Sequence, residues 1–262
     1  MAFSLLAILA YLAAAALLVA DLRRGRGERW PWLSLAACAV LLHACAHVMA
    51  WRASGATDLH FFAALSLVGL GMAALTALFG AGGRMAALGV LVYPLAALVL
   101  ALYAGYGHRV AEPLDWRLQL HAWSALLAYA TLAVGALLAV MLWLQERALR
   151  QHRFHAWSQA LPPLTELETL LFRTLTVGFL LLSATLLTGV LFVADLFAQH
   201  LVHKTVLSVL SWLLFGALLL GRWRWGWRGR VAVRWTLAAM ALLVLAFFGS
   251  KAVLELVLHR TS

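Results

Sequence analysis

The chain has 262 residues, of which 65% are hydrophobic and 11% charged, and its formal net charge is +10. Soluble domains average about 45–50% apolar and about 25% charged residues, so this composition excludes an ordinary soluble enzyme. Because a membrane-crossing helix needs about 20 apolar residues, the chain can hold roughly eight such helices and little else. We predict an all-α, polytopic integral membrane bundle that forms a single membrane domain over residues 1–262.

Stretches free of Asp, Glu, Lys and Arg locate the expected spans. They run over residues 2–20, 30–51, 60–79, 85–106, 118–145, 174–194, 205–221 and 235–250. Each is continuously apolar and does not alternate, which indicates helices and excludes barrel strands. No basic segment precedes the first stretch, so we interpret it as a retained span and not as a signal peptide. Before the sixth span, LPP at 161–163 followed by TELE predicts a helix stop and a new helix start.

Positive charge separates the loops into two sets. One side holds twelve arginines: Arg23, Arg24, Arg26, Arg29, Arg84, Arg147, Arg150, Arg153, Arg222, Arg224, Arg228 and Arg230. The other side holds six basic residues: Arg52, Arg109, Arg117, Lys204, Lys251 and Arg260. By the positive-inside rule the first set faces the cytoplasm, which predicts a multi-pass membrane protein with both termini outward. Tryptophan and arginine together at 222–230 are typical of interfacial anchors, so we expect membrane lipid and no nucleic acid as a partner.

Histidine is the polar residue that this topology distributes most unevenly. Eight of the ten fall on the outer side: His43, His47, His60, His108, His121, His200, His203 and His259. Neutral imidazole is a common ligand of iron and zinc and brings no charge into lipid. A haem with two axial histidines would need two of them facing each other. For each histidine alone, an interfacial or hydrogen-bonded structural role is the alternative.

Motifs of known catalytic chemistry are absent from the sequence. His43 and His47 share one helix face, but they lack the glutamate of an HExxH zinc site. The chain has no GxSxG elbow, Walker loop or dinucleotide-binding loop, so we expect no enzyme. Cys38 and Cys45 form neither a CxxC nor a CxxCH pair, and we interpret them as small apolar positions.

Four stretches resemble the cytochrome c assembly family, which includes the haem-handling CcsA and CcmC proteins. LQLHAWSALLAYATLAVGALLAVMLWL at 118–144 is similar to the span that carries an outward-facing haem histidine. LETLLFRTLTVGFLLLSATLLTGVLF at 167–192 is similar to the following span, with landmarks that include Thr188 and Gly189. The last two are HKTVLSVLSWLLFGALLLGRWRWGWRGR at 203–230 and FFGSKAVLELVLHR at 247–260. The resemblance is best over 118–260 and closest to the YpjD-like inner-membrane branch.

This resemblance implies that haem iron is held by His121 and His259 as external axial ligands. His43 and His60 are further candidates for haem ligation, and His203 is a candidate to replace part of a family loop. The implied function is the binding or handling of haem on the outer, periplasmic side during cytochrome c maturation. Other maturation or inner-membrane proteins are the implied partners.

Two departures from the family pattern keep another function open. The stretch ADLFAQHLVHKT at 194–205 contains no tryptophan, where haem-presenting members carry a tryptophan-rich loop, and Leu220 stands where a family histidine is expected. Both favour a haem-free scaffold or interaction subunit that keeps the fold. A small-solute transporter is the third alternative, and for it only Pro94 interrupts an expected span.

Overall fold

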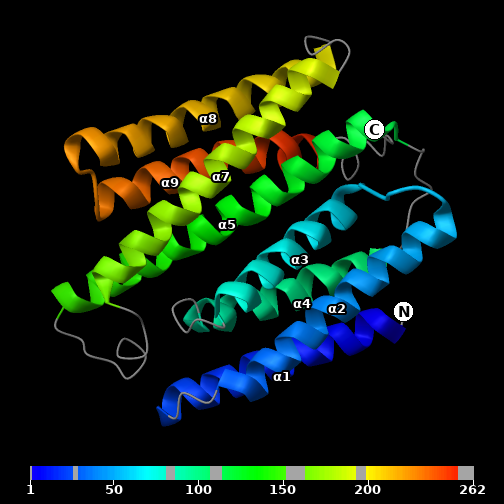
Figure 1. Ribbon diagram of the computed structural model, residues 1–262, viewed down its shortest axis with the longest axis horizontal. Coiled ribbons are helices and arrows are strands. Elements are labelled where there is room, and N and C mark those ends of the chain that lie inside the picture. Colours follow the sequence, from blue (N-terminus) through cyan, green and yellow to red (C-terminus); the bar gives the residue numbers. More distant parts are fainter. Residues whose placement is uncertain are drawn as a thin grey trace. The chain divides into compact units, whose positions relative to one another are not determined.

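A computed structural model of the chain describes residues 2–25, 29–80, 86–106, 114–151, 163–192 and 199–252 (Figure 1). Within these ranges the regular secondary structure is helical, without a strand. Eight of the helices are long and apolar enough to cross a membrane. The predicted all-α fold with eight spans is therefore confirmed.

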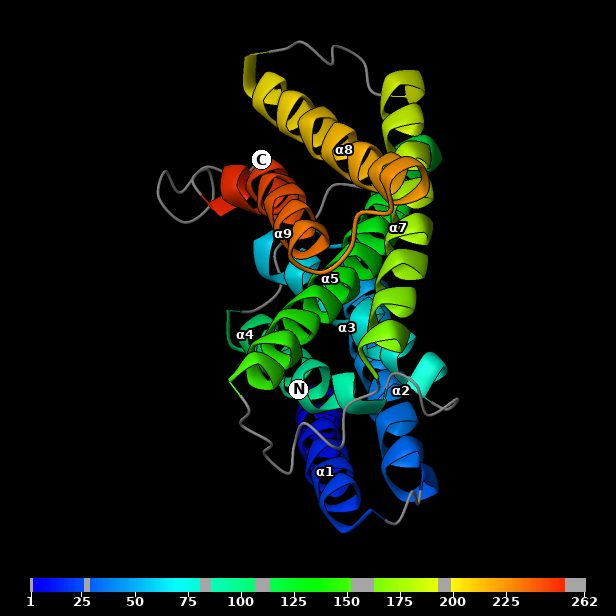
Figure 2. The ribbon, with the colours of Figure 1, turned by 90° about the vertical axis from the view of Figure 1, so that its left-hand side faces the viewer.

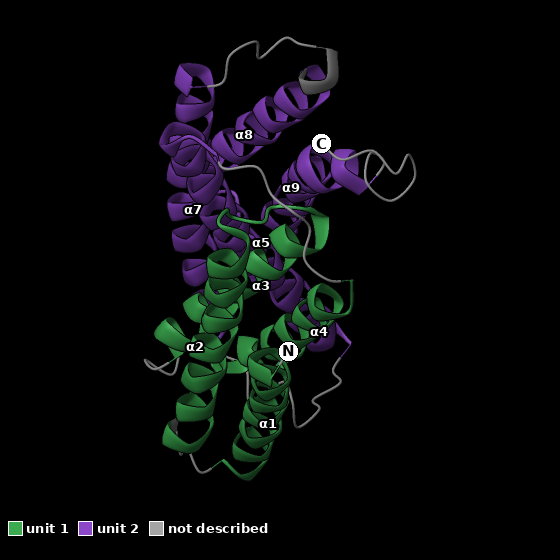
Figure 3. Cartoon of the chain, turned by 90° about the vertical axis from the view of Figure 1, so that its right-hand side faces the viewer, with its two compact units in different colours: residues 1–113, 152–162 green, residues 114–151, 163–262 purple. Residues whose placement is uncertain are grey.

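The chain divides into two compact units, which Figure 3 colours separately. Unit 1 comprises residues 1–113 and 152–162, and unit 2 comprises residues 114–151 and 163–262. Each unit has four long helices in its described part, so each is a small helical bundle with its own core.

Unit 1 is built from the first four spans. Its elements are α1 (Ala2–Arg24), α2 (Arg29–Ser54), α3 (Phe61–Gly80), the short 3₁₀ turn η1 (Ala86–Leu88) and α4 (Gly89–Tyr106). Helix α1 packs against α2 and α4, and α3 packs against α2 and α4. The core includes Ala7, Ala63, Leu100 and Tyr103, and its two alanines allow close helix packing. Helix α4 runs unbroken through Pro94, so this proline does not interrupt the helix as a transporter of the discontinuous-helix type would require.

Unit 2 is built from the last four spans. Its elements are α5 (Trp116–Arg150), α7 (Leu164–Phe192), α8 (Gln199–Trp225), α9 (Arg230–Val244) and the π-helical turn η2 (Leu245–Gly249) that continues α9. Helices α5 and α7 lie side by side along much of their length (Figures 1 and 2). Helix α9 packs against α5 and α8, and α8 also packs against α7.

Charge-free stretches underestimated the length of the helices in unit 2. Helix α5 continues to Arg150, and α7 already begins at Leu164, ten residues before its charge-free stretch. At about 1.5 Å per residue, the 35 residues of α5 measure about 52 Å, against a hydrocarbon core of about 30 Å. Charged side chains at such ends reach the headgroups while the backbone stays helical. The predicted start after LPP is confirmed, because the Pro163 carbonyl accepts the first turn's amides from Glu166 and Leu167.

Glycines fix one antiparallel register between α5 and α7. Gly178 of α7 faces Leu132 of α5, and Gly135 of α5 faces Leu175 of α7. A Cβ at residue 178 would lie 2.5 Å from Leu132 Cδ2 and 3.5 Å from the Leu132 amide nitrogen. These glycines therefore allow the two backbones to approach closely, as small residues do in membrane bundles.

The close contact at Gly178 predicts that alanine at this position destabilises the protein, although alanine in place of glycine normally stabilises a helix. Alanine favours a helix by about 1 kcal/mol over glycine, but Gly178→Ala is expected to lower the free energy of unfolding by about 1–2 kcal/mol through overpacking. The measurement is denaturant unfolding in detergent micelles. The matched control is Gly105→Ala in α4, where an added Cβ meets open space. Equal stability of the two variants would contradict the packing argument.

Candidate functional site

Two of the predicted histidines lie on α2 in unit 1 and share one hydroxyl of α3. His43 is fully buried, and its Nε2 lies 2.9 Å from Ser66 Oγ. His47, one turn later, places its Nε2 3.0 Å from the same oxygen. His43 Nδ1 lies 3.3 Å from the hydroxyl of Tyr11 on α1. Both ring nitrogens of His43 are therefore engaged in hydrogen bonds, and in this arrangement neither is left to bind a metal.

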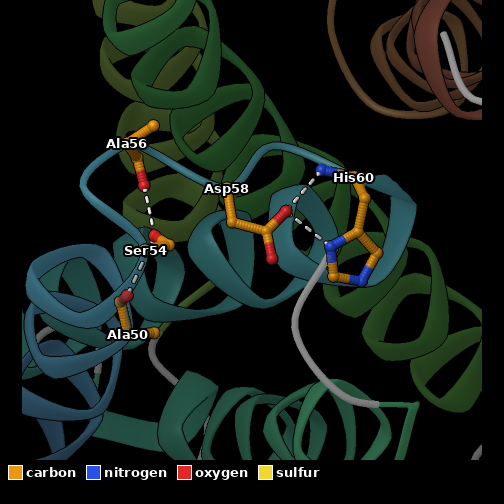
Figure 4. A network of polar contacts seen from close by, with 5 residues as sticks. All are labelled: Ala50, Ser54, Ala56, Asp58 and His60. Carbon is orange, nitrogen blue, oxygen red and sulfur yellow. Dashed lines mark hydrogen bonds and ion pairs between the residues drawn. The ribbon is translucent and has the colours of Figure 1, made fainter. Parts of the chain in front are cut away.

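The segment between α2 and α3 holds a carboxylate–imidazole pair, drawn in Figure 4. His60 Nδ1 donates to Asp58 Oδ1 over 2.6 Å, and the His60 amide donates to the same oxygen over 3.1 Å. Ser54 Oγ, at the end of α2, contacts the carbonyls of Ala50 and Ala56 at 3.0 and 2.9 Å and so shapes the turn. Asp58 thus orients the His60 ring, whose Nε2 has no hydrogen-bond partner among the described residues.

Aromatic stacking joins these histidines into one cluster. The Tyr103 ring of α4 stacks on His47 with centroids 4.5 Å apart, and it lies 5.9 Å from the ring of His60. Within the described residues, no three His, Cys, Asp or Glu side chains are arranged to hold a metal ion. The cluster is a hydrogen-bonded, stacked layer inside an apolar bundle, where each polar group is expensive unless it has a partner.

His121 of α5 has a different environment in unit 2. Its Nδ1 lies 3.1 Å from the Thr185 carbonyl and 3.2 Å from Thr188 Oγ1, both on α7. Because a carbonyl can only accept, Nδ1 carries the proton and the lone pair lies on Nε2. No described residue hydrogen-bonds to Nε2. Metal-bound histidines show this same pattern, in which the other ring nitrogen donates to a carbonyl or carboxylate.

The His121 ring is seated against Gly189, a further position in the α5–α7 register. A Cβ at residue 189 would lie 3.2 Å from His121 Cε1 and 3.6 Å from Nδ1. A side chain there would require the ring to shift by at least a few tenths of an ångström. Ser124, one turn after His121, donates to the His121 carbonyl, and Thr185 Oγ1 lies 3.4 Å from Ser124 Oγ.

These geometries test whether the predicted residues suit haem iron. His121 fits an axial ligand, because it is a neutral imidazole with one oriented and one available nitrogen. His60 shows the same pattern in unit 1. His203 is exposed near the start of α8, and Leu220 on the same helix is 52% exposed. His259 lies outside the described residues, so its pairing with His121 stays a prediction.

Sequence reasoning missed several partners of these histidines. Ser66, Tyr11 and Asp58 were not singled out, because serines, tyrosines and single acids have many structural roles. The Thr185 carbonyl carries no side-chain signal at all. Thr188 and Gly189 were visible only as family landmarks, and the structure gives them a physical role beside His121.

Comparison with known proteins identifies the scaffold. The family model described as cytochrome C assembly protein matches residues 32–258. The chain is 30% identical to the inner membrane protein YpjD of Escherichia coli (strain K12), over 97% of this chain and 98% of that protein. It is 38% identical to an uncharacterized 28.8 kDa protein of Azospirillum brasilense, over 57% of this chain and 56% of that protein. No solved structure matches the chain.

These matches and the helical architecture agree on the membrane location and the family of the chain. Similarity to an inner membrane protein along nearly the whole chain, together with eight candidate spans, makes this a multi-pass bacterial inner membrane protein. The matched family is one of cytochrome c assembly proteins, which supports a role in cytochrome c maturation. This family is not a known enzyme class. Since the family model covers most of the chain and includes the segments that carry His43, His60 and His121, the chain belongs to the cytochrome c assembly protein family.

Proposed function

We propose that the protein binds haem on its outer side through His121 and handles it during cytochrome c maturation. The observation that carries this proposal is the hydrogen bond from His121 Nδ1 to the Thr185 carbonyl, which leaves Nε2 available. When bound, haem would supply an iron that the neutral His121 imidazole could ligate. The distribution of basic loops along the sequence supports the outer side.

Residues around His121 act by positioning it. The Thr185 carbonyl fixes the tautomer and orients the ring, Thr188 Oγ1 provides a second polar contact, and Gly189 leaves the space that the ring occupies. His259 is the proposed second ligand, by resemblance to the family. The role is one of binding and delivery to partner maturation proteins and involves no catalysed reaction.

The test is haem binding by the purified, full-length protein. After loading with haem in detergent, the wild-type protein is expected to show a Soret band, and His121→Ala is expected to lose most of it. His152→Ala, which alters one of the two histidines that the predicted topology leaves on the cytoplasmic side, is the matched control and should keep the band. A Soret band that is unchanged in His121→Ala would overturn the assignment of this ligand.

His60 is the second candidate in the same assay, because Asp58 orients it as Thr185 orients His121. Loss of absorbance in His60→Ala with retention in His121→Ala would move the proposed ligand to unit 1. His43→Ala addresses a further predicted ligand and is expected to keep the band, because both ring nitrogens of His43 are already hydrogen-bonded.

The alternative function is a haem-free interaction subunit in cytochrome c maturation. It is favoured by Leu220, an exposed aliphatic side chain at the position of an expected family histidine. A wild-type protein that is folded but shows no Soret band under any loading condition would support this alternative and exclude the haem-binding proposal.

A further inference from the structure

A basic pocket lies in unit 2 where the end of α5 meets the start of α9. It has a volume of about 250 Å³ and is lined by Trp143, Glu146, Arg147, Arg150, Gln151 and Arg230. Three guanidinium groups beside one carboxylate give the lining a formal charge of +2. Among the described residues, none of the three arginines forms an ion pair. The pocket therefore presents cationic groups whose charge the described part of the chain leaves largely uncompensated.

The length of α5 places this pocket at the level of the lipid headgroups. Trp116 and Trp143 are both exposed on α5, and their separation of 27 positions corresponds to about 40 Å at 1.5 Å per residue. That distance equals the thickness of a bilayer with its headgroups, about 40–45 Å, and tryptophans mark both interfaces. Arg147 and Arg150 follow Trp143 within two turns, and the Arg147 guanidinium lies 5.6 Å from the Trp143 ring centroid.

Arg230, the first residue of α9, lines the pocket opposite the end of α5, and the turn before it is held by several contacts. Gly229 has a φ of +55°, a conformation that side chains disfavour, and its amide donates to Glu168 Oε1 over 2.8 Å. A Cβ at Gly229 would lie 2.7 Å from Glu146 Oε1, so this carboxylate approaches the turn closely. Glu168 also contacts Arg222 at 4.0 Å. These contacts fix the backbone from which Arg230 extends toward the end of α5.

We propose that this pocket binds the phosphodiester headgroup of an anionic phospholipid. Guanidinium groups form paired hydrogen bonds to phosphate oxygens, and basic pockets between membrane helices bind anionic headgroups. Free phosphate shares this chemistry, but the position beside Trp143 favours a lipid. Leu144 and Val231, which flank the lining residues, are exposed apolar side chains that can contact acyl chains. This is the side that the charge distribution predicts to be cytoplasmic.

The test compares lipid retention by two charge-matched variants of the full-length protein. Wild-type protein, the triple variant Arg147→Gln, Arg150→Gln, Arg230→Gln, and the control Arg23→Gln, Arg24→Gln, Arg52→Gln are incubated with equimolar phosphatidylglycerol and phosphatidylcholine in detergent. Native mass spectrometry measures the ratio of the two lipids retained. At roughly a fivefold effect per arginine, the pocket variant should lose about a hundredfold of the preference for phosphatidylglycerol. The control, whose arginines do not line the pocket, should lose far less.

Three results would overturn the proposal. One is a wild-type protein without preference for phosphatidylglycerol, and another is an equal loss in the pocket and control variants. The third is complete displacement of phosphatidylglycerol by excess inorganic phosphate, which would indicate a site for free anions. If the triple variant does not fold, the exposed Arg150→Gln alone should reduce the preference about fivefold.

Discussion

Gly189→Val is expected to weaken haem binding about 10–100-fold, the range found when the hydrogen-bonding environment of a metal ligand is disrupted. The mutation leaves every proposed ligand in place. Its effect comes from the new side chain, because even its Cβ would lie 3.2 Å from His121 Cε1 and must displace the ring. Displacement breaks the 3.1 Å contact between His121 Nδ1 and the Thr185 carbonyl, so the tautomer and orientation are no longer fixed. The measurement is the Soret absorbance during a haem titration.

Two further variants separate this effect from a general loss of stability. Gly105→Val places the same side chain near the end of another helix, in open space, and should bind haem like the wild-type protein. Gly189→Ala should give an intermediate loss, although alanine favours helix formation. Unchanged haem affinity in Gly189→Val would show that the seating of His121 against α7 is not required for haem binding.

His43→Ala is expected to lower the free energy of unfolding by about 3 kcal/mol in haem-free protein, a large part of the usual 5–15 kcal/mol. The side chain is fully buried, so its removal leaves a cavity. It also removes the hydrogen-bond partner of the Tyr11 hydroxyl, while Ser66 keeps its contact with His47. Unfolding in detergent micelles, followed by circular dichroism, measures the effect.

The cavity and the hydrogen bonds contribute separately, and a second substitution distinguishes them. His43→Phe keeps much of the volume and loses both hydrogen bonds, so it should cost about 1–2 kcal/mol, the range for unpaired buried polar groups. His203→Ala, an exposed position, should change stability by less than about 0.5 kcal/mol. A loss in His43→Ala no larger than in His203→Ala would show that the unit 1 cluster does not stabilise the bundle.

Sequence alone was sufficient to predict the spans because their signal is local. Uninterrupted apolar stretches long enough to cross a bilayer must be helical there, and all eight predicted stretches correspond to helices. The ends were less accurate, since α7 begins at Leu164 and carries Glu166 and Glu168 within its first turns. Charge marks where a span leaves the hydrocarbon, but it does not mark where the helix ends.

The candidate site could be predicted only as a set of residue types. Composition and topology indicated histidines on one side, and resemblance to the family selected His121. The same reasoning also named His43 as a possible ligand, although both ring nitrogens of His43 are hydrogen-bonded. Asp58 lies only two residues from His60, yet nothing in the sequence distinguishes an orienting carboxylate from a solvated one.

The sequence by itself therefore determined the membrane class, the helical architecture and the chemical nature of the candidate ligands. The tertiary structure decided which imidazole keeps an available nitrogen. That choice depends on atoms far away in the chain, since Thr185 is 64 residues from His121, and Ser66 and Tyr11 are 23 and 32 residues from His43. The physical reason is that apolar length acts within one helix, whereas the hydrogen bonds of a ring nitrogen are set by the neighbouring helix that packs against it.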